Sequence, residues 1–365
     1  MTVNHPLRGP RTVMVNRNGR TVVAGAHGGY VQRPYLVRNG RTYVQRTYVV
    51  NHVTYTSVYR SYSYGGYCCY YGYVPPVYYA PAYYGWAFNP WVAPVYYSPA
   101  VWGWTAAPWY AYYGFTPYPV YRSAAFWLTD YLIAANLQAA YDANQAAVQE
   151  AYANGVAAGQ QQANAAPPPD NGGTPSAQNE PVQLSPEVKQ MIADEVKAQL
   201  AAEQAAAGSQ AQPAPASAQV PDALNPAERV FIASSNLDVT SSDGQACSLT
   251  PGDVLMRMTD QPDDNQQVNA SVQSSKGSDC ATGTTVAVGV QDLQEMHNQF
   301  RQKIDTGLKT LADKSGSSGL PKAPTTATTA GEVPPATADP KAQEQLAGAL
   351  QDADVTEQAV QQPGS

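Results

Sequence analysis

The sequence predicts an α+β protein built from several dissimilar parts, and three observations support this. Only 13% of the 365 residues are charged and 30 are proline, so long regular elements must be few. Residues 1–129 contain ten arginines and no lysine or acid, whereas residues 130–365 contain eleven basic and 28 acidic residues. All 26 tyrosines lie between Tyr30 and Tyr152. Halves of opposite charge can attract each other, within one molecule or between molecules; the alternative is that each half is simply solvated differently.

The predicted parts differ in pattern and composition. In chain order they are a basic β-hairpin module (1–60), a Tyr/Trp/Pro/Gly-rich repeat segment (61–122), an Ala-rich helix (123–160), a linker (161–183), an amphipathic helix (184–207), a second linker (208–227), a small β-barrel domain with a following helix (228–312) and a tail (313–365). The linkers and the tail are rich in Ala, Gln, Pro, Ser and Thr, which predicts disorder. Within the tail, a short helix is expected over 341–360.

The basic module has the pattern of β-hairpins. In YLVRNGRTYVQRTYVV, residues alternate around Asn39-Gly40, a dipeptide suited to a type I′ turn. Asn18-Gly19 offers a similar turn. Aromatic, β-branched and arginine residues share these strands, so cross-strand Tyr and Arg side chains are expected to stack.

A tandem repeat dominates the aromatic segment. VYYAPAYYGWAFNPWVAP (77–94) is followed directly by VYYSPAVWGWTAAPWYAY (95–112), and the two agree at ten of eighteen positions. Prolines and glycines at regular positions exclude long helices. The rings can stack on a polysaccharide, stack between chains in a cohesive layer, or form the core of an irregular domain. The predicted contact residues are Trp86, Trp91, Trp102, Trp104, Trp109, Tyr78, Tyr79, Tyr96 and Tyr97.

Two helices follow the repeat. The first is Ala-rich, and the second begins at an expected N-cap, Ser185, with Pro186 in the first helical position. The second helix carries one apolar stripe suited to packing on a partner helix. Its residues are Val188, Ile192, Val196 and Leu200.

The four cysteines indicate whether the protein is located in an oxidising or a reducing compartment. Cys247 and Cys280 lie 33 residues apart at predicted strand edges, where a disulfide would join strands. The alternative is two buried free thiols. A disulfide implies an oxidising compartment. Cys68 and Cys69 are adjacent, and we expect them to pair with separate partners, including another chain.

Catalytic and metal-binding patterns are missing. The sequence contains no P-loop, Gly-x-Ser-x-Gly or His-Glu-x-x-His motif, so no catalytic residue and no cofactor is predicted. Asp260, Asp263 and Asp264 lack the rest of a calcium loop and are interpreted as a solvated turn. No metal site is expected, because no cysteine or histidine spacing fits zinc.

Membrane and nucleic-acid binding are not expected. The longest uncharged run, 61–121, holds nine prolines, which disfavours a transmembrane helix. No signal-peptide h-region is visible at the given N-terminus. Arginines and the densest aromatic stretch are largely segregated in an acidic chain, which argues against a nucleic-acid partner.

Two resemblances can be drawn from these motifs. Tyr84-Gly85-Trp86 and Trp102-Gly103-Trp104 resemble the Tyr-x-Trp-Gly-x-Trp-type repeats of uncharacterised bacterial proteins, often exported. The Leu249–Val254 turn, with its strand rhythm, is similar to bacterial SH3-like barrels, although a PDZ-like domain can carry the same turn. An SH3-like barrel implies binding of a peptide or a cell-wall component. Phe231 is the only aromatic residue of this domain before Phe300, so a structural or docking role is expected instead.

The functional expectation is a non-enzymatic, tyrosine-rich structural protein of the bacterial cell envelope or surface. It would be secreted or otherwise extracytoplasmic, because composition and the expected disulfide favour that over the missing signal peptide. It would adhere or self-associate through the aromatic repeat. One alternative is a binding module for cell-wall or capsular polysaccharide. A second is an accessory subunit that docks through its amphipathic helices.

Overall fold

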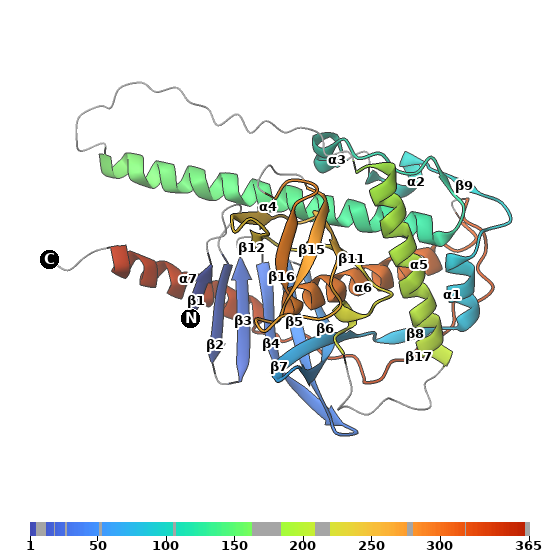
Figure 1. The fold of residues 1–365 in the computed structure, drawn as a ribbon, viewed down its shortest axis with the longest axis horizontal. Coiled ribbons are helices and arrows are strands. Elements are labelled where there is room, and N and C mark those ends of the chain that lie inside the picture. The colour runs from blue at the N-terminus through green and yellow to red at the C-terminus, as the bar shows by residue number, and fades with distance from the viewer. Residues whose placement is uncertain are drawn as a thin grey trace.

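Antiparallel sheets and packed helices make up the chain, in agreement with the predicted α+β class. The computed structural model describes residues 1–4, 12–17, 19–25, 28–50, 53–104, 107–162, 184–208, 220–275, 280–317 and 319–361. Helix α4 (Ala124–Gln162) runs along one side of the molecule, and α7 (Ala342–Gln361) lies beside the first strands (Figure 1). Within these residues, no helix combines the length and the apolar run needed to cross a bilayer.

The first sheet is a seven-stranded antiparallel meander whose strands pair in chain order. Its strands are β1 (Thr2–Asn4), β2 (Thr12–Arg17), β3 (Arg20–Gly25), β4 (Gly28–Arg38), β5 (Arg41–Val50), β6 (Val53–Tyr64) and β7 (Tyr67–Val74). The predicted turn at Asn39-Gly40 is confirmed, because both residues have positive φ and Arg38 pairs with Arg41. Asn18 of the other predicted turn lies outside the described residues. The sheet extends to Val74, beyond the boundary predicted at residue 60.

The second sheet has six antiparallel strands in the order β11-β14-β15-β16-β12-β13. Its strands are β11 (Val230–Ile232), β12 (Leu237–Ser241), β13 (Ala246–Leu249), β14 (Val254–Arg257), β15 (Gln267–Ser274) and β16 (Thr285–Gly289). Helix α6 (Val290–Asp313) follows directly, as the sequence predicts. Closure of this sheet into an SH3-like barrel stays a prediction.

The tandem repeat folds twice as a short strand followed by a short helix. The first copy gives β8 (Val77–Tyr79) and α1 (Pro81–Phe88), and the second gives β9 (Val95–Tyr96) and α2 (Pro99–Trp102). A proline occupies an N-terminal position of each helix, where its missing N–H costs nothing. Gly103 has φ 71° and ends α2, whereas the equivalent Gly85 continues α1. Helix α3 (Pro108–Tyr113) and β10 (Val120–Tyr121) follow, and β10 pairs with β9.

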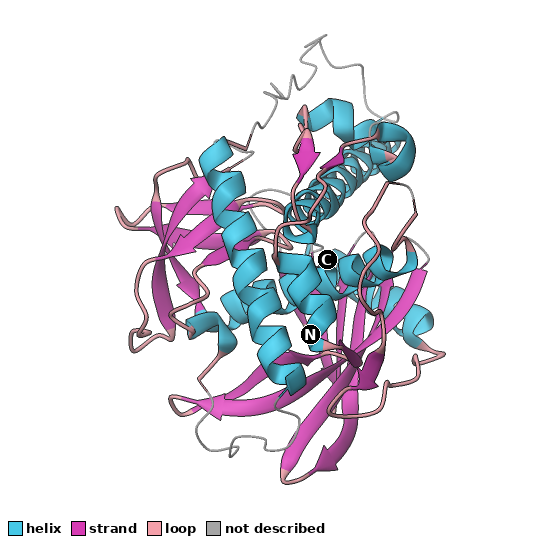
Figure 2. Ribbon diagram, turned by 90° about the vertical axis from the view of Figure 1, so that its right-hand side faces the viewer, coloured by secondary structure: helices cyan, strands magenta, loops and turns pink. Residues whose placement is uncertain are grey.

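Helix α5 (Pro186–Gly208) packs inside its own chain. The Ser185 Oγ accepts a hydrogen bond from the Val188 N–H (3.3 Å), which confirms the predicted N-cap. The predicted partner face of α5 is buried within the chain. All four of its residues lie in the largest hydrophobic core, together with residues of α4 and of the repeat. They are Val188, Ile192, Val196 and Leu200. The face is therefore covered by the chain itself rather than left for a partner helix. Helices lie between the two larger sheets (Figure 2).

The tail corrects the prediction of disorder over 313–365. Its described part forms β17 (Thr328–Ala330), which pairs with β8, and helix α7, which confirms the helix expected over 341–360. Small and aliphatic residues of α7 share a core with Val13, Ala24 and Val31 of the first sheet. Composition alone missed this because the tail buries its apolar side chains on a surface far away in sequence. Most of both predicted linkers, at 163–183 and 209–219, lies outside the described residues.

Candidate functional site

The nine predicted contact residues differ in exposure, and most of them are half-buried. Trp109 and Tyr79 are buried, and Tyr96 is 72% exposed. The others are half-buried, and most of them pack against the largest core. They are Trp86, Trp91, Trp102, Trp104, Tyr78 and Tyr97. The repeat therefore builds much of a local core, which was one of the three uses the sequence left open.

The tryptophan rings of the second repeat copy gather around Trp127, a residue of α4. Its ring is 1% exposed and lies 5.0 Å from the ring of Trp102 and 6.2 Å from that of Trp104. Tyr131, one turn further along the helix, stacks on it at 5.1 Å. Aromatic rings at 4.5–7 Å attract each other beyond the effect of burial alone. These contacts hold the second repeat copy against α4 and occupy much of the ring surface of Trp102 and Trp104.

The first repeat copy instead borders a cleft. A cavity of about 540 Å³ lies between the chain around Trp86 and Trp91 and the turn that follows α6. Its lining is Trp86, residues 89–94, residues 316–317 and residues 319–322. Trp91 is the residue equivalent to Trp109 in the other copy, yet it reaches the surface where Trp109 does not. This cleft is the candidate binding site.

The geometry of the cleft favours Trp91 as its platform. Trp86 is enclosed between Tyr83 (ring centroids 5.4 Å apart) and Trp91 (5.2 Å). The Trp91 Nε1–H donates to the Trp86 backbone oxygen (3.1 Å), which fixes the indole. Among the described residues Trp91 has a ring neighbour on one side only. Trp91 is half-buried and lines the cleft, so part of its indole is available to a ligand.

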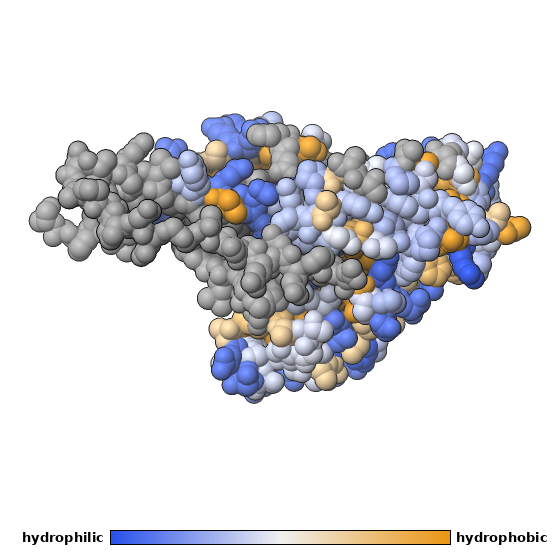
Figure 3. All heavy atoms as spheres, turned by 90° about the horizontal axis from the view of Figure 1, so that it is seen from above, coloured by the Kyte–Doolittle hydropathy of each residue, from blue (hydrophilic) through white to orange (hydrophobic). Residues whose placement is uncertain are grey.

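Polar groups complete the rim of the cleft. Asn89 and Lys322 are exposed and line it, and they offer an amide and an ammonium group. Hydrophobic residues also reach the surface at the end of the molecule that carries α1 and β9 (Figure 3). Val92 is fully exposed within the lining. An aromatic platform beside a few polar groups is typical of small-ligand and sugar sites.

The sequence identified one wall of this cleft and missed the other. Trp86 and Trp91 stand among the predicted contact residues, but the wall at 316–322 belongs to the segment predicted as disordered tail. Lys322 carries no local signal, because its place depends on a contact with residues more than 200 positions earlier.

A buried ion pair joins the basic sheet to α6. The Arg46 guanidinium contacts the Glu295 carboxylate (2.7 Å) and lies over the rings of Tyr59 (4.2 Å) and Tyr30 (4.7 Å). The predicted stacking of cross-strand tyrosine and arginine is thus confirmed. Burial raises the pKa of Tyr59 well above its ordinary value, so this hydroxyl stays protonated beside Tyr48. The cluster is a structural joint between the two oppositely charged halves.

The acidic turn at 260–264 is held by hydrogen bonds. Asp260 accepts from Arg229 (2.7 Å) and from Arg257 (2.7 Å), and the side chain of Asp263 accepts from the backbone N–H of Asn265 and of Gln267. Asp260 is therefore ion-paired rather than simply solvated. Across the described part of the chain, no cluster of three or more His, Cys, Asp or Glu residues could hold a metal ion.

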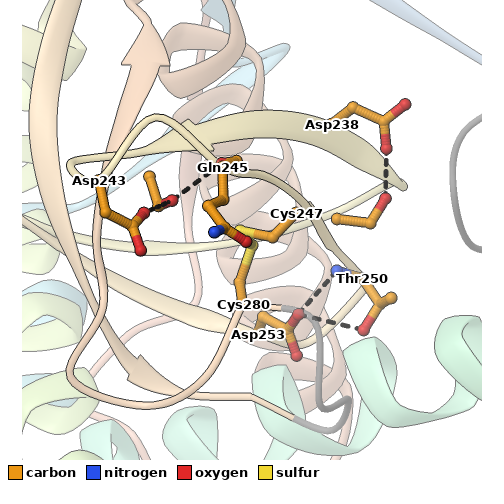
Figure 4. The surroundings of a disulfide bond; sticks show 9 residues. Asp238, Asp243, Gln245, Cys247, Thr250, Asp253 and Cys280 are labelled. Atoms are coloured by element: carbon orange, nitrogen blue, oxygen red, sulfur yellow. Dashed lines mark hydrogen bonds between the residues drawn. A yellow bond between two sulfur atoms is a disulfide. The ribbon is translucent and has the colours of Figure 1, made fainter.

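Both cysteine pairs are joined. Cys247 of β13 and Cys280, in the connection between β15 and β16, form a disulfide (Cα–Cα 5.2 Å). Nearby, the Asp253 carboxylate accepts hydrogen bonds from the backbone N–H and the hydroxyl of Thr250 (Figure 4). Cys68 and Cys69 are joined to each other in β7. The expectation that they reach separate partners therefore differs from the structure, in which neither thiol is free.

Replacing both Cys247 and Cys280 by serine is expected to lower the free energy of unfolding by about 3–4 kcal/mol, because the bond closes a loop of some thirty residues. Urea unfolding, followed by far-UV circular dichroism, would measure it. The matched control is the Cys68→Ser/Cys69→Ser variant, which opens no long loop and should lose far less. Equal losses in the two variants would contradict a loop-closing role.

The architecture places the chain in the mixed α+β class, with an aromatic cleft as its candidate site. Comparison with protein-family models, with curated proteins and with solved structures finds no match.

Proposed function

We propose that this chain is a non-enzymatic binding protein of the bacterial cell envelope, whose aromatic cleft binds a cell-wall or capsular polysaccharide. The observation that carries the proposal is the cleft at Trp86 and Trp91, which pack against the core on one side and line the cleft on the other. The face of an indole ring is apolar, and it can cover the C–H face of a sugar, while Asn89 and Lys322 can bond its hydroxyl or carboxylate groups.

The envelope location is supported by the disulfide between Cys247 and Cys280, because such bonds persist in oxidising compartments. In this proposal the six-stranded sheet closes into an SH3-like barrel with a docking role. The aromatic groove usual in peptide-binding barrels is missing, since Phe231 is buried.

The test is retention on immobilised, purified cell-wall and capsular polysaccharides. Trp91→Ala removes the platform, and we expect at least about tenfold weaker binding, since a buried aromatic anchor typically contributes more than 1.4 kcal/mol. Tyr96→Ala is the matched control, because Tyr96 is an exposed repeat residue outside the cleft lining and should bind as the unchanged protein does. Unsaturable retention, or equal binding by the Trp91→Ala variant, would contradict the proposal.

Self-association through the repeat is a second candidate. Val92 and Tyr96 are both exposed at the end of the molecule that carries the cleft, and apolar side chains exposed together can form a contact between copies. Assembly that grows with protein concentration in the absence of glycan, and that Tyr96→Ala abolishes, would favour this candidate over polysaccharide binding.

A further inference from the structure

The C-terminal strap, residues 320–361, is held by a carboxylate site on the first sheet. This strap seat consists of Arg38, Arg41, Tyr43 and Arg60. The Glu332 carboxylate receives the Arg41 guanidinium (2.6 Å) and the Tyr43 hydroxyl (2.5 Å), and Arg60 lies 3.6 Å away. Arg38 donates to the backbone oxygen of Glu332 (2.7 Å). Hydrogen bonds from two donors to one carboxylate are strong and directional.

The backbone beside Glu332 fits closely. The N–H of Gly331 donates to the Pro76 oxygen (2.9 Å), and a Cβ at residue 331 would lie 2.1 Å from the Pro75 oxygen. Only glycine permits this approach. On the other side of Glu332, Val333 is 3% exposed in a small core with Tyr43 and Val74. The seat therefore fits a Gly-Glu-Val sequence: the close backbone approach suits Gly331, the arginines pair with Glu332, and the apolar pocket holds Val333.

Further contacts extend this recognition along the strap. The Tyr35 hydroxyl donates to the Pro334 oxygen (3.1 Å), and the Gln45 amide donates to the Thr337 oxygen (3.1 Å). The Asp339 carboxylate is 4% exposed and lies within 3.9 Å of both Arg20 and Arg33. The part of the strap that precedes α7 is thus bound as an acidic peptide, by contacts with residues of the opposite half of the chain.

Charge also sets which peptide the seat accepts. The first 129 residues are basic without any acid, whereas the strap holds six acidic and two basic residues. The strap of one copy can bind the strap seat of another copy, because its contacts with the seat would be the same. Only the path of the residues that connect α6 to the strap would change. The residues that precede β17, which form the wall of the aromatic cleft, make this connection.

We propose that the strap seat is a recognition site for an acidic Gly-Glu-Val segment, and that it accepts the strap of a second copy of this chain. In the isolated chain its own strap occupies the seat, since a tethered segment has the advantage of a high effective concentration. Exchange of straps links copies and goes beyond the polysaccharide binding proposed above.

Two full-length variants test the exchange. Glu332→Arg disables the strap but leaves the seat intact, because arginine would face Arg41 and Arg60. Arg41→Glu disables the seat but leaves the strap intact, because Glu332 would face a carboxylate. Each variant alone is expected to be a monomer of 39.0 kDa. Mixed in equal amounts, they should give a one-to-one complex of twice that mass by light scattering, since the free strap of one occupies the free seat of the other.

Control experiments distinguish loss of strap binding from unfolding of the chain. Gly331→Val disables the strap by steric clash and should complement Arg41→Glu in the same way. A synthetic peptide of residues 326–341 should bind the Glu332→Arg variant saturably and the unchanged protein at least tenfold more weakly, because its seat is occupied. A mixture that stays monomeric, together with no peptide binding to the Glu332→Arg variant, would overturn the proposal. Polysaccharide retention is measured on the unchanged protein in its monomeric form, so its outcome is separate from either result.

Discussion

Trp127→Ala is expected to lower the free energy of unfolding by about 3–5 kcal/mol, the range for emptying a buried tryptophan site. Trp127 is 1% exposed, and its ring contacts those of Trp102, Trp104 and Tyr131. A small side chain leaves a cavity that neighbouring rings on separate segments cannot fill without moving. Urea unfolding followed by circular dichroism would give the loss, and the tryptophan fluorescence of the folded variant would report exposure of Trp102 and Trp104.

The matched control for this prediction is Tyr96→Ala, which removes an aromatic ring of the same repeat from an exposed position. Exposed substitutions typically change stability by no more than about 0.5 kcal/mol. A large difference between the two variants would mean that the second repeat copy serves as a core. If Trp127→Ala were as stable as the control, the rings around it would not act as a core, and the division between the two repeat copies would fail.

The two copies of the repeat show how far a motif predicts structure. Proline and glycine positions excluded long helices from the repeat, since both act through the local backbone, but the short helices α1 and α2 were not predicted. The same Gly-Trp dipeptide nevertheless lies inside α1 in one copy and after α2 in the other. Each copy adapts to its neighbours, because β8 pairs with the tail and β9 pairs with β10. Local sequence therefore predicts the elements, and tertiary contacts decide where each one ends.

Contacts distant in sequence account for most of what could not be predicted. The Asn39-Gly40 turn and the α5 cap at Ser185 depend on nearby residues and were found from the sequence. Glu332 gives no local sign of a fold, because its partners Arg41 and Arg60 lie in the opposite half of the chain. The split of charge raised the possibility that the halves attract each other, without showing which residues meet. One wall of the cleft was hidden for the same reason.

Arg301→Met is expected to cost about 3–5 kcal/mol at pH 8, because removing one partner of a buried ion pair leaves the other charge uncompensated. Arg301 of α6 contacts the Glu203 carboxylate of α5 at 2.5 Å, and the Glu203 side chain is only 2% exposed. Arg301 also donates to the backbone oxygen of Tyr73 (3.3 Å), so it joins α5, α6 and the first sheet. Methionine keeps most of the packing volume and removes the charge.

The loss should be smaller at pH 5.5, because of Asp305 in the same cluster. Burial, and then the nearby Glu203 charge, raise the pKa of Asp305 to about 8, although hydrogen bonding from Tyr73 and the charge of Arg301 lower it. The folded chain therefore keeps a proton that the unfolded chain releases above its ordinary pKa of about 4, so stability falls as the pH rises from about 4 to 8. Without Arg301, the pKa of Asp305 rises further, because the charge that lowers it is gone. The variant therefore loses more stability than the unchanged protein as the pH rises to 8.

Urea unfolding of both proteins at pH 5.5 and pH 8 would measure the difference. The double variant Arg301→Met/Glu203→Met is the control, and it should recover much of the loss, since replacing both partners by apolar residues removes the uncompensated charge. An equal loss at both pH values, with no recovery in the double variant, would mean that Arg301 acts through packing alone. A smaller loss at pH 5.5, with recovery in the double variant, would show that the charge pair between Arg301 of α6 and Glu203 of α5 holds these two helices together.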